Sequence, residues 1–407
     1  MSVDTPARIA VLGAGPIGLE AALYARFLGY EVMLYERGRI AEHVLHWGHV
    51  RMFTPWQMNV SPLGVAALRA QHPDWHLPAD DLLITGRQWA ESYLLPLAAS
   101  DLLADNIQIE TQVTALARRG LLKGDAADLE ERGERDLLVS VRDAQGVERI
   151  DKADVVIDAT GTYGRPNFLG PGGLPAIGQG LLAGEIEAGL PDIAGADRER
   201  YAGRSVLVVG AGHSAATNVL ALAALEPPAQ VTWVTRKSPD EGPMGPVELV
   251  PDDPLPERDC LARSANALAR ADDGIVRHWP GTWVKRLERA DGSSLLRVQL
   301  IGEHKQEIEV ERIIANVGYR PDQALSSELH VAWCHSSDAP RNLAANPDAG
   351  PERLLQPEPD YYVLGAKSSG RRSSFLFFDG LRQIRDLFTI VGDRAELDLY
   401  RTMSRQS

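Results

Sequence analysis

A glycine-rich segment that occurs twice in the chain constrains its fold more than any other sequence feature. The first copy has apolar residues at 8–12, then Gly13-Ala14-Gly15-Pro16-Ile17-Gly18, a helical pattern, and a second apolar run that ends at Glu36. This order predicts a strand, a tight turn, a helix and a parallel strand. Gly13 permits the turn, Gly15 lets a pyrophosphate approach the backbone, and Gly18 lets the helix pack on the sheet. The pattern predicts a dinucleotide site at the helix N-terminus, with a strand–helix connection without ligand as the alternative.

The second copy begins with the apolar residues 205–209. It continues through Gly210-Ala211-Gly212-His213-Ser214-Ala215, a helical pattern and the apolar run 231–234. Ala215 replaces the third glycine, which the motif tolerates because a methyl group still allows close packing. An internal repeat of this kind indicates a repeated architecture, and two such loops imply two bound nucleotides.

The residues that end the two copies differ in charge. Glu36 is a carboxylate that would accept hydrogen bonds from the hydroxyl groups of an unphosphorylated ribose. Arg236 and Lys237 end the second copy, and cations at this position suit the 2′-phosphate of NADP. The first loop is therefore predicted to bind a nucleotide without that phosphate and the second to bind NADP(H). Basic surface residues beyond an edge strand are the alternative interpretation of Arg236 and Lys237.

Length and composition limit the class of protein. A chain of 407 residues exceeds one ordinary core, and 44% hydrophobic with 24% charged residues is typical of a soluble globular protein. The net charge of −14 argues against nucleic-acid binding, which needs basic surface. The two cysteines, Cys260 and Cys334, are far apart, so we expect no disulfide framework and a cytoplasmic location. We expect no signal peptide and no membrane partner, because the N-terminus is polar and no apolar run reaches the ~18 residues that span a bilayer.

Each half of the chain repeats one plan. Segments with the pattern of antiparallel strands follow each glycine loop, at 137–150 and at 284–310, and return strands then end in glycine, at 154–161 and 313–318. We therefore predict an α/β fold with two Rossmann-like dinucleotide-binding domains and inserted antiparallel β-meanders. The predicted boundaries are 1–165 for the first part of the first domain, 166–203 for a crossover linker, 204–322 for the second domain and 323–407 for the return to the first domain.

Segments outside this repeated plan have simpler interpretations. Residues 89–103 and 379–391 have helical patterns, and the highly charged residues 120–135 are expected to form an exposed excursion. His43, His46 and His49 recur every three residues, but without nearby cysteines or a second ligand cluster we expect loop packing and no metal. The proline-rich residues 240–256 are a candidate lid.

The ordered set of motifs resembles the two-dinucleotide-binding-domain flavoproteins, a superfamily that includes thioredoxin reductases, flavin-containing monooxygenases and bacterial N-hydroxylases. In that superfamily the first loop holds FAD, the second holds NAD(P)H, and the C-terminal segment returns to the flavin. The resemblance implies an FAD site formed by Gly13, Ala14, Gly15, Pro16, Ile17, Gly18, Glu36, Arg37, Trp47, Thr54, Val113, Thr160, Gly161, Gly365 and Gln383. It implies an NADPH site formed by Gly210, Gly212, His213, Ser214, Ala215, Arg236 and Lys237.

Local motifs favour one branch of this superfamily. Disulfide reductases carry a redox cysteine pair near the flavin, and this chain has no such pair. The segments 46–48 and 51–56, rich in tryptophan and proline, and the loop Gly-x-Gly-His-Ser-Ala look like the flavin-containing monooxygenases. Two features depart from the superfamily: a Phe-x-Gly-x-x-x-His fingerprint is missing before the second loop, and Gly365-Ala366-Lys367 replaces the Gly-Asp of the reductases.

The resemblance implies an FAD-dependent monooxygenase that uses NADPH and O2 to oxygenate a small molecule at nitrogen, sulfur or a carbonyl carbon through a flavin hydroperoxide. Asn59 is the candidate amide for a hydrogen bond to that intermediate, and an amide that satisfies backbone groups in a turn is the alternative. The other functions to consider are an NADPH-dependent reductase or dehydrogenase that passes electrons to a small acceptor or partner protein, and a non-catalytic nucleotide-binding sensor. The substrate and the oligomeric state, including a homo-oligomer, stay open.

Overall fold

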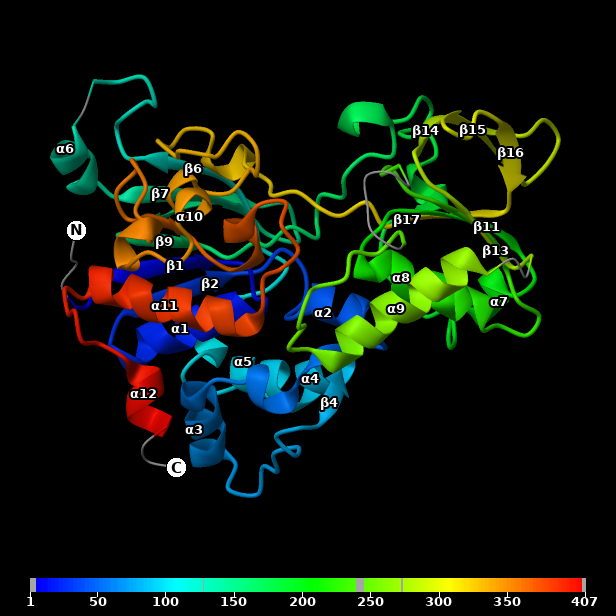
Figure 1. Ribbon diagram of the computed structural model, residues 1–407. Coiled ribbons are helices and arrows are strands. Elements are labelled where there is room, and N and C mark those ends of the chain that lie inside the picture. Colours follow the sequence, from blue (N-terminus) through cyan, green and yellow to red (C-terminus); the bar gives the residue numbers. More distant parts are fainter. Residues whose placement is uncertain (1–4, 127, 239–244, 272–273, 405–407) are drawn as a thin grey trace. The chain divides into compact units, whose positions relative to one another are not determined.

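The structure, a computed structural model, describes residues 5–126, 128–238, 245–271 and 274–404. The chain divides into two compact units, both visible in Figure 1. Unit 1 contains residues 1–48, 54–165 and 320–407, and unit 2 contains residues 49–53 and 166–319. The chain thus leaves unit 1 after Arg165 and returns to it at Arg320. These two points are adjacent, since the Arg320 amide donates a hydrogen bond of 3.0 Å to the Arg165 carbonyl.

A parallel five-stranded sheet forms the centre of unit 1. Its strand order is β18 (Tyr361–Val363), β9 (Val155–Asp158), β1 (Arg8–Leu12), β2 (Glu31–Tyr35) and β5 (Ile107–Gln108). Strands β1 and β9 are almost wholly buried, because a parallel sheet is covered on both faces and its strands are correspondingly apolar. Strand β18 comes from the C-terminal part of the chain, so this sheet is complete only after the chain has returned from unit 2.

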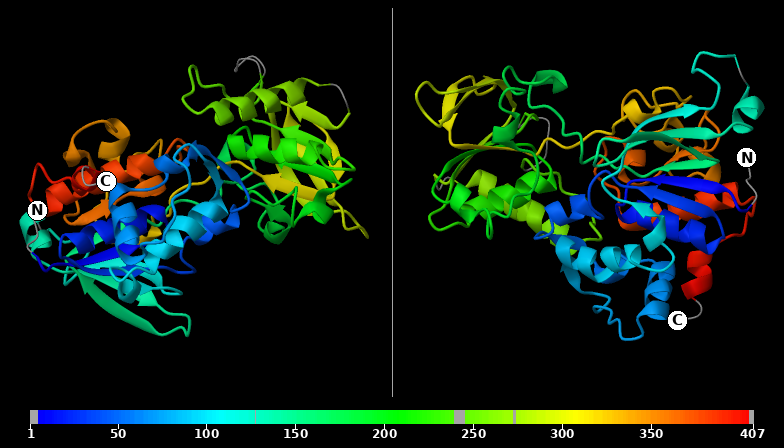
Figure 2. Two further views of the ribbon diagram at one scale, coloured as in Figure 1. Left: turned by 90° about the horizontal axis from the view of Figure 1, so that it is seen from below. Right: turned by 180° about the vertical axis from the view of Figure 1, so that it is seen from behind.

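Different layers cover the two faces of this sheet, as Figures 1 and 2 show. Helices α1 (Pro16–Phe27) and α11 (Phe377–Val391) pack together on one face, where the rings of Tyr24 and Phe388 stack with centroids 5.0 Å apart. Strands β6 (Gln112–Arg118), β7 (Leu137–Arg142) and β8 (Glu148–Ala153) form an antiparallel layer that shares a buried core with Ala10 and Leu12 of β1.

Unit 2 repeats this plan. Its parallel sheet has the order β10 (Ile186–Glu187), β17 (Arg312–Ala315), β11 (Ser205–Val209), β12 (Gln230–Val234) and β13 (Val276–Trp279). Val206 and Val208 of β11 pack toward α8 (His213–Ala223) and α9 (Pro256–Arg270). The alternate residues Leu207 and Val209 pack toward the antiparallel strands β14 (Thr282–Arg289), β15 (Leu296–Gly302) and β16 (Glu307–Val310). The predicted α/β fold with two Rossmann-like halves and inserted meanders is therefore confirmed.

The remaining elements are short. The helices and strands are α2 (Glu42–His46), β3 (Arg51–Pro55), α3 (Pro62–Gln71), β4 (Leu83–Thr85), α4 (Gly86–Trp89), α5 (Leu95–Ala98), α6 (Leu129–Gly133), α7 (Arg198–Tyr201), α10 (Arg341–Ala345) and α12 (Leu399–Ser404). The 3-10 turns are η1 (Trp56–Met58), η3 (Ala104–Asn106), η4 (Pro171–Gly173), η5 (Ala183–Glu185), η7 (Ala324–Ser326), η8 (Pro351–Leu354) and η9 (Gly365–Ser369). The helix predicted at 89–103 is instead a continuous helical segment at 86–98, in which a π-helical turn, η2 (Ala90–Leu94), joins α4 to α5.

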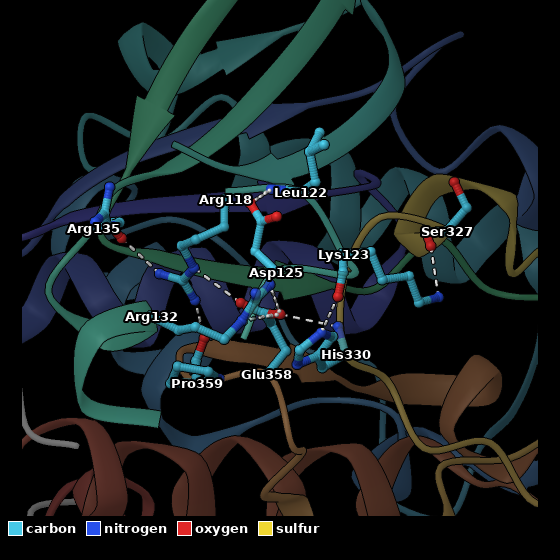
Figure 3. A network of polar contacts seen from close by, with 10 residues as sticks. All are labelled: Arg118, Leu122, Lys123, Asp125, Arg132, Arg135, Ser327, His330, Glu358 and Pro359. Carbon is cyan, nitrogen blue, oxygen red and sulfur yellow. Dashed lines mark hydrogen bonds and ion pairs between the residues drawn. The ribbon is translucent and has the colours of Figure 1, made fainter. Parts of the chain in front are cut away.

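The described residues of the charged segment 120–135 are mostly exposed, as expected, but the segment also contains a buried ionic anchor at Arg132. Two arginine side chains, each at most 1% exposed, pair with the fully buried Glu358. Arg118 lies just before the segment, and Arg132 lies within it. Arg118 Nε lies 2.9 Å from one carboxylate oxygen, and an Arg132 guanidinium nitrogen lies 2.7 Å from the other (Figure 3). A buried carboxylate needs cationic partners of this kind. The pattern of charges in the sequence alone does not distinguish these buried arginines from solvated ones.

The same network fixes the chain just before β18. Arg118 donates further hydrogen bonds to the carbonyls of Arg135 and Pro359, and the backbone amide of His330 donates to Glu358 at 2.9 Å (Figure 3). The charged segment is therefore tied to the residues that lead into the C-terminal strand of the sheet.

Two further segments bear on the sequence predictions. Residues 240–244 of the candidate lid lie outside the described residues, and Val247, in the described remainder, is held by two hydrogen bonds to the Asn266 amide on α9. Leu169, Ala176 and Leu182, from the segment expected to be a crossover, pack into the core of unit 2. Within the described chain, no helix has the length and apolar character to cross a membrane.

Candidate functional site

The first glycine loop joins β1 to α1 in unit 1, and its glycines have separate roles. Gly13 has φ = +97°, and a Cβ there would lie 2.9 Å from the Ala159 carbonyl oxygen. A Cβ on Gly18 would lie 1.9 Å from the Gly13 carbonyl oxygen, so only glycine allows this helix to approach the loop. A Cβ on Gly15 would meet no atom within 4 Å. Gly15 thus borders open space at the helix N-terminus.

The N-terminus of α1 is suited to an anionic group. Gly15 is the N-cap, Pro16 follows it, no side chain caps the helix, and its first turn contains no acidic residue. The first amides of a helix have no partner inside the helix, and they carry the positive end of its dipole. In the described chain this end is therefore available for a phosphate group.

Glu36 lies at the end of β2, beside the first glycine loop. Its carboxylate accepts hydrogen bonds from the amides of Ala14 and Gly38, each 2.8 Å long. The next residue, Arg37, is exposed and lies 3.2 Å from the His43 ring nitrogen. Burial lowers the pKa of His43, and the charge of Arg37 lowers it further. Glu36 therefore holds the loop in place, while Arg37 adds a positive charge at the same edge of the sheet.

The residues after β9 form a buried polar cluster. Asp158 accepts hydrogen bonds from the Thr160 hydroxyl at 2.7 Å, from Tyr361 at 2.8 Å and from Lys367 Nζ at 2.5 Å. Lys367 and Asp158 are fully buried. Burial by itself raises the pKa of Asp158, but the charge of Lys367 and these hydrogen bonds outweigh it and hold the pKa below its ordinary value. The cluster fixes the turn at Thr160 and Gly161, beside the glycine loop.

The C-terminal segment reaches the same loop. Gly365 has φ = +72°, and a Cβ there would lie 3.4 Å from Ile17 Cβ. A Cβ on Gly380 of α11 would lie 2.1 Å from Ile17 Cδ1. Gln383, also on α11, accepts a hydrogen bond of 2.9 Å from the Gly365 amide. The structure therefore brings Gly13–Gly18, Thr160, Gly161, Gly365 and Gln383 together in unit 1.

Other predicted residues of the first site lie in its surroundings. Trp47 packs on Gly86, and its buried Nε1 has no hydrogen-bond partner within the described residues. Thr54 is buried and donates its hydroxyl proton to the Asn59 amide oxygen at 3.0 Å. The Asn59 amide nitrogen donates to the carbonyls of Thr54 and Pro55, as expected for the turn interpretation. Val113 is a core residue of the antiparallel layer.

The second glycine loop joins β11 to α8 in unit 2. Gly210 has φ = +134°, and a Cβ there would lie 2.1 Å from the Asn316 carbonyl oxygen, while a Cβ on Gly212 would meet nothing within 4 Å. No side chain caps α8, its first turn contains no acidic residue, and Ala215 is fully buried. His213 contacts the Phe53 ring at 5.7 Å between centroids, and burial, then the charge of Arg258, lowers its pKa.

Arg236 and Lys237 follow β12 after one residue, Thr235, at the same edge of the sheet as the second loop. Both side chains are exposed, and neither has a hydrogen bond or ion pair within the described residues. Ser214, in the first turn of α8, is also exposed. The structure thus places two unpaired cations beside an uncapped helix N-terminus in unit 2.

Sequence reasoning missed the polar residues that support the two loops. Asp158 and Lys367 lie at the ends of apolar runs, and only the departure from Gly-Asp at Gly365-Ala366-Lys367 pointed to this place. In unit 2, the Asn218 amide donates to Asn316 at 2.8 Å, and both asparagines donate to the Gly189 carbonyl. Single asparagines within apolar segments give no pattern that predicts such contacts.

Comparison with known proteins identifies this architecture. No protein-family model and no curated protein matches the chain. Among solved structures, the bacillithiol disulfide reductase Bdr (YpdA) from Bacillus cereus superimposes with a TM-score of 0.67 and 16% identity, over 98% of this chain and 99% of that one.

A monooxygenase and an N-hydroxylase superimpose almost as well. The FAD-bound cadaverine monooxygenase DfoA from Erwinia amylovora has a TM-score of 0.65 and 15% identity, over 96% of both chains. The ornithine N-hydroxylase KtzI from Kutzneria sp. 744, solved with reduced FAD, NADP⁺ and L-ornithine, has a TM-score of 0.63 and 16% identity, over 95% of this chain and 99% of that one. At such identities these superpositions show the fold, which is that of the two-domain flavoproteins.

Proposed function

We propose that this protein is an FAD-dependent monooxygenase that uses NADPH and O2 to oxygenate a small molecule. The observation that carries the proposal is the presence of two strand–glycine loop–helix units in a chain without a redox cysteine pair. The flavoprotein fold, shared with DfoA and KtzI, supports it. The overall reaction balances as substrate + O2 + NADPH + H⁺ giving oxygenated substrate, NADP⁺ and water.

The residues of unit 1 fit the ADP half of FAD. The open space at Gly15 suits a pyrophosphate against the backbone, and the uncapped N-terminus of α1 suits its negative charge. Arg37 adds a cation near the phosphates, and each oxygen of the Glu36 carboxylate has a second lone pair for a ribose hydroxyl. Gly365 and Gln383 would approach the flavin end, because Gly365 lies against Ile17 at the end of the loop and Gln383 is hydrogen-bonded to Gly365.

The residues of unit 2 fit NADPH for the same reasons, with one difference. Gly212 and the uncapped N-terminus of α8 suit the pyrophosphate. Arg236 and Lys237 are free to contact a 2′-phosphate.

Replacing Arg236 with alanine is expected to raise the KM for NADPH about tenfold or more and to leave the KM for NADH almost unchanged, which steady-state kinetics would show. An equal loss for both cofactors would contradict the phosphate assignment.

Bound FAD would supply the capacity to accept hydride from NADPH and to activate O2. The chain itself would exclude water and hold the cofactors in position. Lys367 and Asp158 fix the Thr160 turn on one side, and Gln383 fixes Gly365 on the other. No side chain of the described residues is assigned as an acid or base of the reaction, and Asn59 stays a prediction, with its amide engaged in the turn after β3.

The proposal is tested with purified protein loaded with FAD. NADPH oxidation, O2 uptake, H2O2 release and product mass are measured with primary amines, thioethers and ketones as candidate substrates. We expect one compound class to gain a single oxygen atom with one NADPH consumed per product and little H2O2. Release of one H2O2 per NADPH with every compound, or failure to retain FAD, would count against a monooxygenase.

A reductase that acts on a small disulfide is the second candidate. It is favoured by one feature of unit 1, the Cys334 thiol, whose pKa is lowered to about 6 by hydrogen bonds from Ser336 and Ser337. The superposition on the bacillithiol disulfide reductase also supports it. Such an enzyme would convert one disulfide and NADPH + H⁺ into two thiols and NADP⁺. NADPH-dependent reduction of cystine that disappears in Cys334→Ser would establish this activity, whereas the monooxygenase reaction is expected to survive the substitution.

A further inference from the structure

A polar cavity of about 220 Å³ lies in unit 1, close to the flavin end of the proposed FAD site. Four segments form it: residues 337–348, which include α10, Arg353 of η8, residues 368–375, and the first two turns of α11. The volume is below the roughly 300–1,000 Å³ of pockets for drug-sized ligands, so the cavity suits a small molecule or one end of a larger one.

The cavity shares a wall with the proposed flavin site. Ser368 and Gln383 line it, and the Gln383 amide donates to the Ser368 hydroxyl at 2.7 Å. Ser368 in turn donates to the Gly365 carbonyl at 2.7 Å, and the Gly365 amide donates to Gln383. A ligand in the cavity would therefore contact the side chains that hold Gly365 in position.

Two arginines that line the cavity have no partner in the part of the chain that the structure describes. The side chains of Arg372 and Arg382 are exposed, and within the described residues neither makes an ion pair or hydrogen bond. Their neighbours in sequence differ, because Arg371 pairs with Asp338 at 2.5 Å and Arg385 pairs with Asp386 at 2.5 Å. Of these four arginines, the two without a partner among the described residues are the two that line the cavity.

A third arginine lies deeper in the cavity wall. Arg353 is 5% exposed, and its terminal nitrogens bond to Asp386 at 2.6 Å and to the carbonyls of Ala349 and Gly350. Its Nε is buried and has no partner in the described chain. A buried donor without an acceptor costs about 1–3 kcal/mol, which an acceptor oxygen in the cavity would recover.

Two acidic residues, Asp348 and Asp379, also line the cavity. Asp379 is engaged at the start of α11, where its carboxylate accepts a hydrogen bond of 2.9 Å from the Leu376 amide. Asp348 is exposed at the rim and makes no ion pair within the described residues. Arg353 is already paired with Asp386, so its remaining contribution to the cavity is the unpartnered Nε. The exposed guanidinium groups of Arg372 and Arg382 offer an anion paired N–H donors.

We propose that this cavity binds the anionic group of the substrate, a carboxylate or a phosphate, through Arg372 and Arg382 with Arg353 at its base. This inference rests on the proposed function, because it makes the cavity the place where the substrate is held beside the flavin. Guanidinium groups bind either anion through two parallel hydrogen bonds, so the two share one recognition chemistry.

The test measures anion binding directly, without turnover. Calorimetric titrations of the FAD-loaded protein with succinate and with inorganic phosphate, at constant ionic strength, are expected to show saturable binding of at least one of them with one site per chain. The variant Arg372→Gln/Arg382→Gln is expected to weaken this binding about tenfold or more and to keep its FAD and its unfolding midpoint. Preference for succinate or for phosphate identifies the anion.

Arg371→Gln is the matched control, because it removes one exposed charge from the adjacent position outside the cavity. It is expected to bind the anion as the unaltered protein does. Absence of saturable binding of both anions, or equal weakening in the control, would overturn the cavity assignment. Anion binding that is lost in the double variant, in a protein that oxygenates no compound, would instead retain the cavity and contradict the proposed function.

Discussion

At the scale of single residues, the glycines of the first loop fall into two groups. The fold itself requires some of them, and it does not require another. Gly13 and Gly18 are required by the protein itself, because a side chain at either would meet backbone atoms. Gly15 is not required in this way, because its φ of −78° is open to any residue and the space beside it is open. We therefore attribute the glycine at position 15 to the pyrophosphate proposed to lie beside it.

This difference predicts opposite outcomes for two alanine substitutions. Gly15→Ala is expected to unfold at nearly the same urea concentration as the unaltered apoprotein but to lose most of its FAD, because the methyl group occupies the place of the pyrophosphate. Gly18→Ala is expected to lose both FAD and stability, by about 1–3 kcal/mol, because α1 must shift from the sheet. Urea titrations and FAD content of both variants check this. Normal FAD content in Gly15→Ala would contradict the assignment of the site.

The buried pair of Lys367 and Asp158 gives a second prediction at this scale. Lys367→Met is expected to lower the free energy of unfolding by about 3–5 kcal/mol, because it leaves a buried carboxylate without its cation. The double variant Asp158→Asn/Lys367→Met is expected to recover much of that loss, since both charges are removed. Urea titrations of the single and double variants provide the measurement. A double variant less stable than Lys367→Met would show that the pair does not act as a unit.

Some of these residues could be predicted from the sequence, and others could not. The positions of the glycines follow from the local geometry of a strand–turn–helix connection, so the pattern predicts them. Lys367 and Asp158 are brought together by the pairing of β18 with β9, and nothing in the sequence near either residue depends on that contact. The same holds for Arg118 and Arg132, whose partner Glu358 is distant in sequence.

At the scale of elements, a buried carboxylate connects three helical segments of unit 1. Glu20 of α1 is fully buried and accepts a hydrogen bond from the hydroxyl of Tyr93, which lies in the π-helical turn η2. The same hydroxyl accepts a hydrogen bond of 3.0 Å from the amide of Ser61, the N-cap of α3. Burial raises the pKa of Glu20 to about 7, against the hydrogen bonds from Tyr93 and Ser61 that lower it.

This raised pKa predicts an unusual dependence of stability on pH. Between its unfolded pKa of 4.5 and its folded value of about 7, Glu20 holds more protons in the folded protein than in the unfolded chain. Its contribution to the free energy of unfolding therefore falls as pH rises through this window, and stays low above it. Glu20→Gln cannot ionise, so its stability relative to the unaltered protein should rise by about 3 kcal/mol between pH 4 and pH 8. Urea titrations across this range that show parallel pH profiles for the two proteins would refute this.

The elements themselves were predictable to different degrees. The two strand–loop–helix–strand copies and both antiparallel meanders follow from apolar patterns that span five or more residues. The helix predicted at 89–103 ends earlier and contains a π-helical turn, because Tyr93 reaches inward to Glu20 and Ser61. Such a tertiary contact can override the local helical pattern, and the sequence around 90–94 does not reveal it.

At the scale of the whole molecule, unit 2 is an insertion into unit 1. The chain leaves and returns through Arg165 and Arg320, which are joined by a backbone hydrogen bond. Apart from the short segment 49–53, unit 2 is one continuous stretch with its own buried cores. Each unit therefore contains the contacts that its own sheet requires.

This arrangement predicts that unit 1 survives without unit 2. A chain in which a short Gly-Ser linker joins Arg165 directly to Arg320 is expected to fold and to retain FAD, because the two ends are already adjacent. It should lose NADPH oxidation, since the second glycine loop is absent. Cooperative unfolding and FAD content would be measured, with the same chain carrying Gly15→Ala as the control. A linked chain that does not fold would show that unit 1 depends on unit 2.

The pairing of β18 with β9 also sets a sequence of events during synthesis on the ribosome. Residues 166–319 emerge as one stretch and can close their sheet while most of the C-terminal segment has not been made. Until β18 arrives, β9 is an open sheet edge, which a nascent chain must protect from pairing with other chains. The Gly13 loop is made before residues 166–319, whereas Gly365 and α11, which complete its surroundings, are made after them. The first glycine loop can thus hold its proposed cofactor only after residues 166–319 have been made.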